Sequence, residues 1–215
     1  MGLLSALFER RDSLENPKTS LANPDAWLWD AFGASKSVAG TRVNERTALG
    51  VTAIGAAIRL LANTIASLPL SAYRRVERGK TRAQDHPVHR LVHTRPNAEM
   101  TSFTWREIGM GHLLAWGNFF NEIERDRAGR PIALWPLRPD ATQVVRLPSG
   151  ERAYVTQVDG KEYTLAASDV LHIPGLGFDG LVGYSPIRLH REAIGLTMAA
   201  EEFGARFFGD GSRPA

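Results

Sequence analysis

The chain has 215 residues, of which 43% are hydrophobic and 23% are charged, and its formal net charge at pH 7 is +3. These values are those of an ordinary globular protein of one domain or two small ones, and they exclude a disordered or fibrous chain. Because the sequence has no cysteine and no apolar run of about 18 residues, it excludes a disulfide framework, a thiol nucleophile, a cysteine-ligated zinc site and a membrane-spanning helix.

Residues 1–43 have the features of an arm. A short amphipathic helix is expected from Met1 to Arg11, and two Asn-Pro steps and the stretch GASKSVAG follow it as turn and linker signals. Trp27, Trp29 and Phe32 interrupt these signals with large apolar side chains. We therefore expect an arm that docks on the core or on a neighbouring chain.

The first long periodic segment predicts a helix from about Asn44 to Leu68. Asn44 or Thr47 is suited to cap its start, and Pro69 ends the pattern. Apolar residues recur along it at steps of three and four, which predicts one buried side. These residues are Val51, Ile54, Ile58, Leu61, Ile65 and Leu68.

A basic hairpin is expected next. The segment LPLSAYRR is typical of a strand, and Gly79 provides a turn before the chain returns. The cations around this turn are Arg74, Arg75, Arg78, Lys80 and Arg82. Because Glu77 lies among them, we interpret the tip as a solvent-exposed turn, with a phosphate contact as the alternative.

Two helices follow, one from Pro87 to about Val92 and one from Thr101 or Ser102 to about Trp116, where Gly117-Asn118 is a helix stop. Near the first helix lie three histidines, of which the second and third are four residues apart: His86, His89 and His93. Such a pair on a continuous helix is able to bind a metal, but the turn at residues 94–97 ends the helix. Surface or capping histidines are therefore the favoured interpretation.

The next part of the chain predicts strands joined by hairpins. Segments 119–126 and 131–137 flank Ala128-Gly129, and Asp159-Gly160 is the sharpest hairpin signal of the chain. With a last strand at 169–174, this pattern predicts an α+β fold with a mainly antiparallel sheet packed by helices. The large aromatics fall at positions suited to a core, namely Trp105, Trp116, Phe119, Phe120 and Trp135.

Gly175, Gly177 and Gly180 spell GxGxxG after the last strand, a pattern found in dinucleotide-binding loops. In those loops the third glycine opens a helix, whereas here four residues intervene before Ser185 and Pro186 start one. We interpret the segment as a structural corner, with dinucleotide binding as the weaker alternative.

A second motif, Pro139-Asp140 followed by Asp159-Gly160-Lys161, imitates the PD…DxK signature of restriction-type nucleases. In such enzymes the second acid lies within a strand and points at a metal ion, whereas Asp159 is expected in a hairpin turn. A metal-dependent nuclease with Asp140, Asp159 and Lys161 therefore remains the alternative function.

From about Val43 to Pro214 the chain resembles the portal proteins of tailed bacteriophages, in the lambdoid siphophage branch that prophages and gene-transfer agents also carry. The resemblance rests on blocks that occur in the family's order: residues 48–75, 86–101, 117–139, 169–187 and 193–214. The fourth block reads DVLHIPGLGFDGLVGYSPI.

The resemblance implies a structural protein and not an enzyme, with no cofactor, no metal and no membrane partner. Portal proteins are dodecameric rings at a capsid vertex that admit and release double-stranded DNA, and their partners are the major capsid protein, the terminase large subunit and the head-tail connector. The expected location is the virion, with the host cytoplasm during assembly.

The resemblance also implies a division of the chain into an arm, residues 1–43, and an α+β body like the portal wing domain, residues 44–215. The stem and clip are expected in a further C-terminal half. No catalytic, cofactor or metal residue is assigned. The expected signature positions are structural: Pro96, Asn97, Gly117, Asn118, Pro136, Asp169, His172, Gly180, Gly183, Ser185 and Pro186.

Overall fold

The computed structural model describes residues 37–177 and 179–209. The helix expected at Met1–Arg11 lies outside these residues, as does the predicted arm up to residue 36, so the division at residue 43 stays a prediction. The helices are α2 (Glu45–Ala48), α3 (Thr52–Ser67), α4 (Pro87–His93), α5 (Ser102–Trp116), α6 (Pro186–Leu189) and α7 (Arg191–Gly209), with 3-10 turns η2 (Pro139–Ala141) and η3 (Ala167–Asp169). The strands are β1 (Tyr73–Arg75), β2 (Lys80–Arg82), β3 (Asn118–Arg125), β4 (Pro131–Leu137), β5 (Thr142–Arg146), β6 (Arg152–Val158), β7 (Lys161–Ala166) and β8 (Val170–Pro174).

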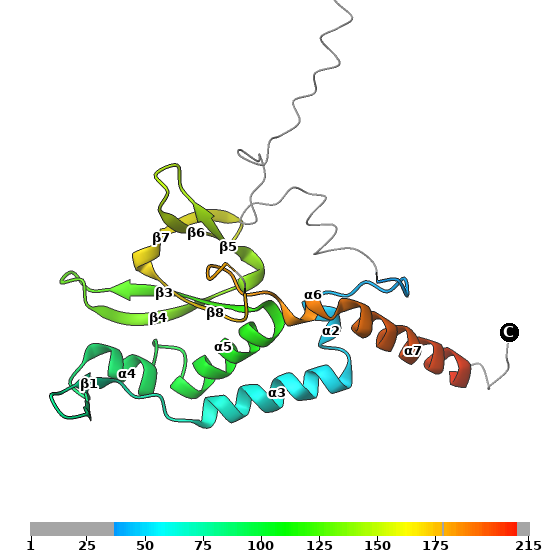
Figure 1. Cartoon of the computed structure of the whole chain (residues 1–215), viewed down its shortest axis with the longest axis horizontal. Coiled ribbons are helices and arrows are strands. Elements are labelled where there is room, and N and C mark those ends of the chain that lie inside the picture. The colour runs from blue at the N-terminus through cyan, green and yellow to red at the C-terminus, as the bar shows by residue number, and fades with distance from the viewer. Residues whose placement is uncertain (1–36, 178, 210–215) are drawn as a thin grey trace, which may run out of the picture.

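The described strands form three small antiparallel sheets, ordered β1-β2, β4-β3-β8 and β5-β6-β7. Figure 1 shows the last two sheets above α5, with α3 beneath α5, so helices and sheets lie in successive layers. The α+β class with hairpins is therefore confirmed. The predicted single sheet is divided because η2 and η3 turn the chain between the two three-stranded sheets.

Strand β3 is buried on both faces over its first four residues because it lies between the helices and the second sheet. Successive side chains of a strand point to opposite faces. Phe119 packs with Trp105 of α5 and Leu134, whereas Phe120 packs with Tyr154 of β6. One strand thus joins two hydrophobic clusters.

The prediction of one helix from Asn44 to Leu68 is wrong in one respect, because the chain breaks between α2 and α3. The Asn44 side chain accepts hydrogen bonds from the backbone N–H groups of Arg46 and Thr47, and the Thr47 hydroxyl accepts one from the Asn44 N–H. This capping box confirms Asn44 as an N-cap. Gly50, a weak helix former, lies in the break.

The expected buried side of α3 is also partly wrong. Leu61 and Leu68 are 48% and 56% exposed, whereas Ala62 and Ala66 are buried against α5. Small residues allow two helices to approach closely, so α3 packs through its alanines. At its C-terminus, the Arg106 guanidinium of α5 donates two hydrogen bonds to the Ala66 carbonyl oxygen.

Helix α7 extends away from the body, at the opposite end from β1 and β2 (Figure 1). Its base packs in a cluster formed by α2, α3 and α6, with Ile194 against Val43, Val51 and Ile187. A break at His190 separates α6 from α7. Among the described helices, none has the length and apolar character that a bilayer crossing needs.

Candidate functional site

Two segments that are far apart in the sequence meet at one corner of the fold. Gly117 ends α5 with a left-handed φ of 78°, as the predicted helix stop requires. A Cβ atom on Gly117 would lie 2.1 Å from the Tyr184 carbonyl oxygen, and one on Gly183 would lie 2.0 Å from the Gly117 carbonyl oxygen. Only glycine permits two backbones to approach this closely.

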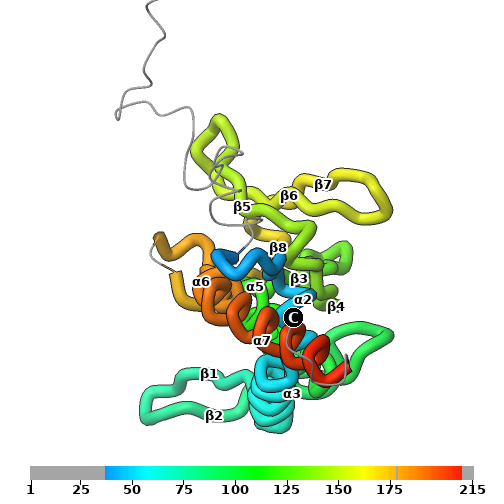
Figure 2. Tube along the Cα trace, turned by 90° about the vertical axis from the view of Figure 1, so that its right-hand side faces the viewer, coloured from blue at the N-terminus to red at the C-terminus, as the bar shows by residue number. Residues whose placement is uncertain are grey.

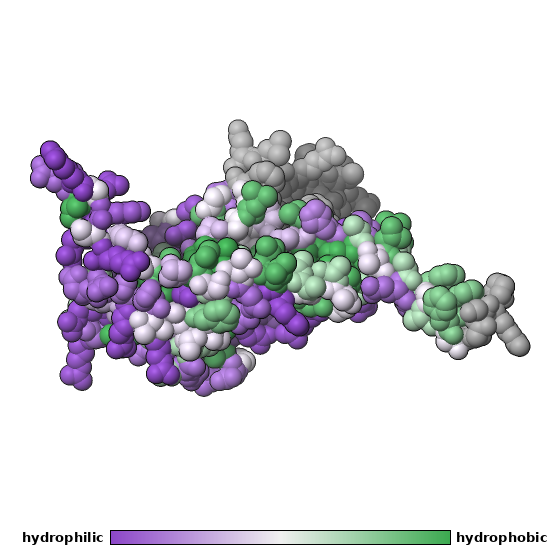
Figure 3. Space-filling model, turned by 90° about the horizontal axis from the view of Figure 1, so that it is seen from below, coloured by the Kyte–Doolittle hydropathy of each residue, from purple (hydrophilic) through white to green (hydrophobic). Residues whose placement is uncertain are grey.

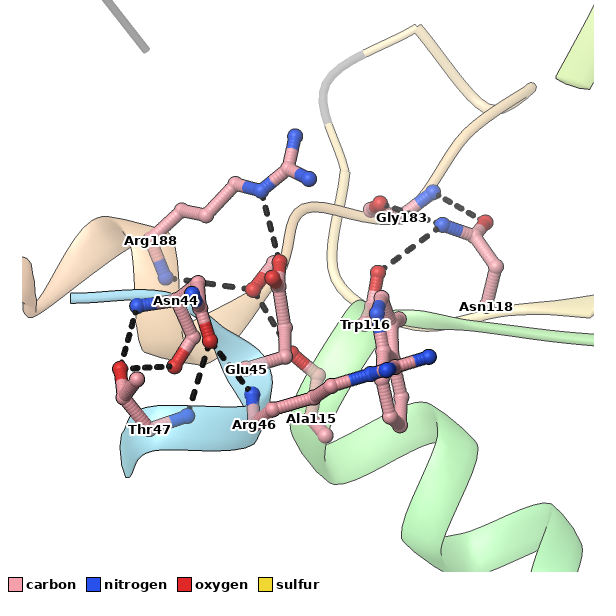
Figure 4. Close-up of polar contacts among 10 residues, drawn as sticks. Asn44, Glu45, Arg46, Thr47, Ala115, Trp116, Asn118, Gly183 and Arg188 are labelled. Atoms are coloured by element: carbon pink, nitrogen blue, oxygen red, sulfur yellow. Dashed lines mark hydrogen bonds and ion pairs between the residues drawn. The ribbon is translucent and has the colours of Figure 1, made fainter. Parts of the chain in front are cut away.

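The buried Asn118 side chain bonds to the second of these segments (Figure 4). Its Nδ2 donates to the Gly183 carbonyl oxygen at 2.7 Å, and its Oδ1 accepts from the Gly183 N–H at 2.8 Å. The same Oδ1 lies 3.0 Å from Nε2 of His172 on β8. One amide therefore fixes the start of β3, the middle of β8 and the glycine-rich loop together.

His172 is held as a neutral ring. Because Asn118 Oδ1 is an acceptor, His172 Nε2 carries the proton and donates it, which leaves Nδ1 to accept from the Tyr154 hydroxyl at 3.3 Å. Burial lowers the pKa of His172 to about 4, and the charge of Arg152 acts in the same direction. The ring also packs against Phe120, with centroids 4.4 Å apart.

Ser185 and Pro186 start α6 as predicted. The Ser185 hydroxyl accepts from the Arg188 N–H at 3.2 Å and donates to the carbonyl oxygen of Ala115, near the end of α5, at 2.7 Å. The Arg188 guanidinium in turn bonds to the buried Glu45 carboxylate of α2 at 2.7 Å (Figure 4). The corner thus sets the position of α6 relative to α5 and α2.

Several backbone N–H groups in and directly after the GxGxxG loop donate to other groups of the protein. The N–H groups of Gly175 and Gly183 donate to the Gly117-Asn118 pair, and those of residues 181–182 donate to the Asp179 carboxylate. These bonds lower the pKa of Asp179. A phosphate-binding loop needs such N–H groups free to face an anion. The arrangement therefore favours the structural corner over a dinucleotide site.

The residues of the nuclease motif are placed differently from a metal centre. The carboxylate of Asp140 pairs with Arg138 at 2.7 Å and Arg46 at 3.1 Å, and these hydrogen bonds lower its pKa. Asp159 has a φ of 51° in the exposed β6–β7 turn, and Lys161 begins β7. Within residues 37–177 and 179–209, no group of three His, Asp or Glu side chains is placed to hold a metal ion.

The side chains of the three histidines near α4 contact nearby backbone groups. His86 Nδ1 accepts from the Val88 N–H and caps the helix. His89 Nδ1 accepts from the Ala72 N–H, and Nδ1 of His93 lies 3.0 Å from the Leu70 carbonyl oxygen. The capping interpretation is confirmed for His86. It is wrong for His89, which is buried and bonds to the segment after α3; His93 lies exposed beside the same segment.

Of the expected signature positions, the structure brings six together in this corner: Gly117, Asn118, His172, Gly183, Ser185 and Pro186. Gly180, with a φ of 68°, turns the same loop. Asn97, which follows the buried Pro96, donates from Nδ2 to the Leu134 carbonyl oxygen of β4. The last two lie on other elements, Pro136 within β4 and Asp169 in η3 near Arg125.

Sequence reasoning missed two members of the corner, Glu45 and Tyr154. Glu45 is a charged residue directly after a cap, a position that normally faces solvent at a helix N-terminus. Tyr154 belongs to a hairpin strand that was expected to alternate between inside and outside, yet it is completely buried. Both are buried through contacts with elements distant in the sequence, which local patterning does not reveal.

A sequence model described as phage portal protein matches residues 52–215. The chain is 35% identical, over an alignment that covers all of it, to the probable portal protein of Streptomyces phage phiC31, and it spans 49% of that protein. It is 29% identical to the portal protein of Enterobacteria phage HK97, covering 80% of this chain and 41% of the relative. The chain thus spans about half the length of these curated relatives.

The fold is also found in solved structures. A chain in the neck of an empty gene transfer agent particle, computed with C6 symmetry, matches 94% of this chain and 52% of its own length, with a TM-score of 0.66 and 23% identity. At this level of identity the likeness concerns the fold.

Proposed function

Because the chain belongs to the phage portal protein family, we propose that it is a structural subunit of a portal ring at a capsid vertex. The ring would form the channel for packaging and ejection of double-stranded DNA. The described body within residues 44–215 would be the wing of the subunit, and the preceding arm would contact a neighbour. The portal names of the two phage relatives support this proposal.

The partners proposed for the ring are further copies of this chain, twelve in all, the major capsid protein, the terminase large subunit and the head-tail connector. The location proposed is the virion, after assembly in the host cytoplasm. No catalytic residue and no cofactor are assigned. The polar atoms of the corner bond to one another, so we propose that they hold the local structure in place and take no part in a reaction.

The observation that carries the proposal is the exposed apolar surface of α7. Leu196, Phe203 and Phe208 are 66%, 72% and 76% exposed on a helix that extends away from the body (Figure 1). Exposed apolar surfaces of this kind mark interaction sites. We assign a second copy of the chain as the occupant, because a ring subunit needs one surface that fits a different surface of its neighbour. Two neck structures of gene transfer agent particles that share this fold were computed with C6 and C12 symmetry.

Light scattering after size-exclusion chromatography tests this assignment. The wild-type chain is expected to self-associate as its concentration rises, and the Phe203→Asp/Phe208→Asp variant is expected to remain a monomer. The control is Val158→Asp, which replaces an exposed apolar residue on β6 and is expected to associate like wild type. A wild-type chain that stays monomeric, or a double variant that associates normally, would contradict the proposal.

A further inference from the structure

The β1–β2 hairpin carries the strongest local charge of the described structure. Its ten residues from Tyr73 to Arg82 contain five Arg or Lys and one Glu. Their net charge, five minus one, is +4, which exceeds the net charge of +3 of the whole chain. Figure 2 shows the hairpin extending from the body, and Figure 3 shows hydrophilic residues over the end of the molecule to which it belongs. Both strands are exposed along their full length.

The strand register sorts these charges onto two faces. Tyr73 pairs with Arg82 and Arg75 pairs with Lys80, and residues directly opposite each other in an antiparallel pair share a face. One face therefore presents three cations around a tyrosine ring. On the other face Arg74, which lies opposite a threonine, bonds to the Asp85 carboxylate at 2.8 Å.

The three-cation face lacks a carboxylate to balance it. Within the described part of the chain, Arg75, Lys80 and Arg82 form no ion pair, although Arg75 and Lys80 are like charges on directly opposite positions. Like charges so placed repel each other unless an anion lies between them. Lys80 Nζ lies 5.0 Å from the centroid of the Tyr73 ring, and Arg82 lowers the pKa of the Tyr73 phenol through a hydrogen bond and its charge.

We propose that the face formed by Tyr73, Arg75, Lys80 and Arg82 binds the phosphate backbone of double-stranded DNA without reading its sequence. The guanidinium fork fits a phosphate in a bidentate manner. A protein partner is disfavoured, because stable protein interfaces bury an apolar centre, whereas half of the residues in this hairpin are cations. The identification of DNA as the polyanion rests on the proposed function, since a portal subunit meets duplex DNA during packaging.

Fluorescence anisotropy with a labelled duplex of random sequence, titrated with the full 215-residue chain at several salt concentrations, tests the proposal. Each phosphate contact contributes about −0.9 to the slope of log K against log salt concentration. The Arg75→Gln/Lys80→Gln/Arg82→Gln variant is therefore expected to bind more weakly, with a slope smaller in magnitude by about 2 to 3.

The matched control removes three exposed cations elsewhere, at Arg42, Arg59 and Arg127, and is expected to keep the wild-type slope. Equal losses in both triple variants would overturn the proposal by showing that only the net charge matters. An unchanged slope in the hairpin variant would overturn it as well. Competition with poly-glutamate provides a further test. If poly-glutamate displaced the duplex at an equal concentration of negative charges, the proposal would be overturned, because the face would then prefer an acidic protein.

Far-ultraviolet circular dichroism checks that each variant folds, and light scattering of the same variants separates this proposal from the proposed function. The hairpin variant is expected to self-associate like wild type, because α7 is unchanged. Wild-type DNA binding combined with a monomeric chain would contradict the ring proposal alone. Normal association without a hairpin effect on DNA binding would contradict the DNA proposal alone.

Discussion

The Gly117–Gly183 corner and helix α7 use their side chains in opposite ways. In the corner, buried polar groups such as Asn118 and Ser185 bond to other parts of the same chain. On α7, large apolar groups such as Phe203 point into solvent. In this chain the buried polar groups fix the shape of the body, whereas the large apolar groups of α7 are exposed, which is the arrangement expected if α7 associates with another subunit as proposed.

Substitution of Gly117 tests how rigidly the corner is fixed. Gly117→Ala adds a Cβ atom 2.1 Å from a carbonyl oxygen at a φ of 78°, so we expect the free energy of unfolding to fall by about 3 kcal/mol or more. Urea denaturation measures this change.

Gly129→Ala is the matched control, because Gly129 has nearly the same φ, 76°, but open space around it. It should cost only about 1 kcal/mol, the cost of the left-handed conformation. Equal losses in the two variants would show that the close approach of the two segments does not contribute to stability.

A smaller effect is expected at the start of α6. Ser185→Ala removes the N-cap and also leaves the buried Ala115 carbonyl without its donor, so we expect a loss of about 2 kcal/mol in the free energy of unfolding. Thr101→Ala removes the N-cap of α5 without a comparable buried partner and should cost about 1 kcal/mol. If chemical denaturation gave the same loss for both, Ser185 would act as a cap alone.

The pH dependence of stability reports on the buried histidines of the body. Burial lowers the pKa of His112 and of His172 to about 4, below the value of about 6.5 in an unfolded chain. The unfolded state therefore binds more protons between these values, and the free energy of unfolding should decrease as the pH falls from about 6.5 towards 4.

His172→Gln should flatten this decrease, and the same change at the exposed His190 should leave it unaltered. Thermal melts across this pH range provide the measurement. A profile of the His172→Gln variant as steep as that of wild type would show that the corner histidine does not contribute.

Much of the fold could be predicted from the sequence, because its signals are local. Hairpin turns such as Asp159-Gly160 and caps such as Asn44 and Ser185 depend on neighbouring residues, and all three are found where expected. Which side of α3 is buried was not predicted, since hydrophobicity alone favoured Leu61 and its apolar neighbours over Ala62 and Ala66. Which side of a helix is buried depends on the helix that it meets, and that partner is distant in the sequence.

The corner was predicted in part for the same reason. Its glycines and Asn118 were recognisable as turn residues, whereas the convergence of Glu45, Tyr154 and His172 needed the tertiary structure. The exposed face of α7 was also hidden in the sequence, because an apolar stripe on a helix normally indicates a buried side. That these apolar side chains are exposed follows only from the structure, in which α7 extends away from the body.

Negative-stain imaging of the purified protein, combined with native mass spectrometry, tests most directly whether this chain is a ring subunit. We predict closed ring particles of one rotational symmetry, whose mass is a fixed multiple of the subunit mass, and their loss in the Phe203→Asp/Phe208→Asp variant. A protein that remains monomeric at every concentration, with no ring in the images, would contradict the account.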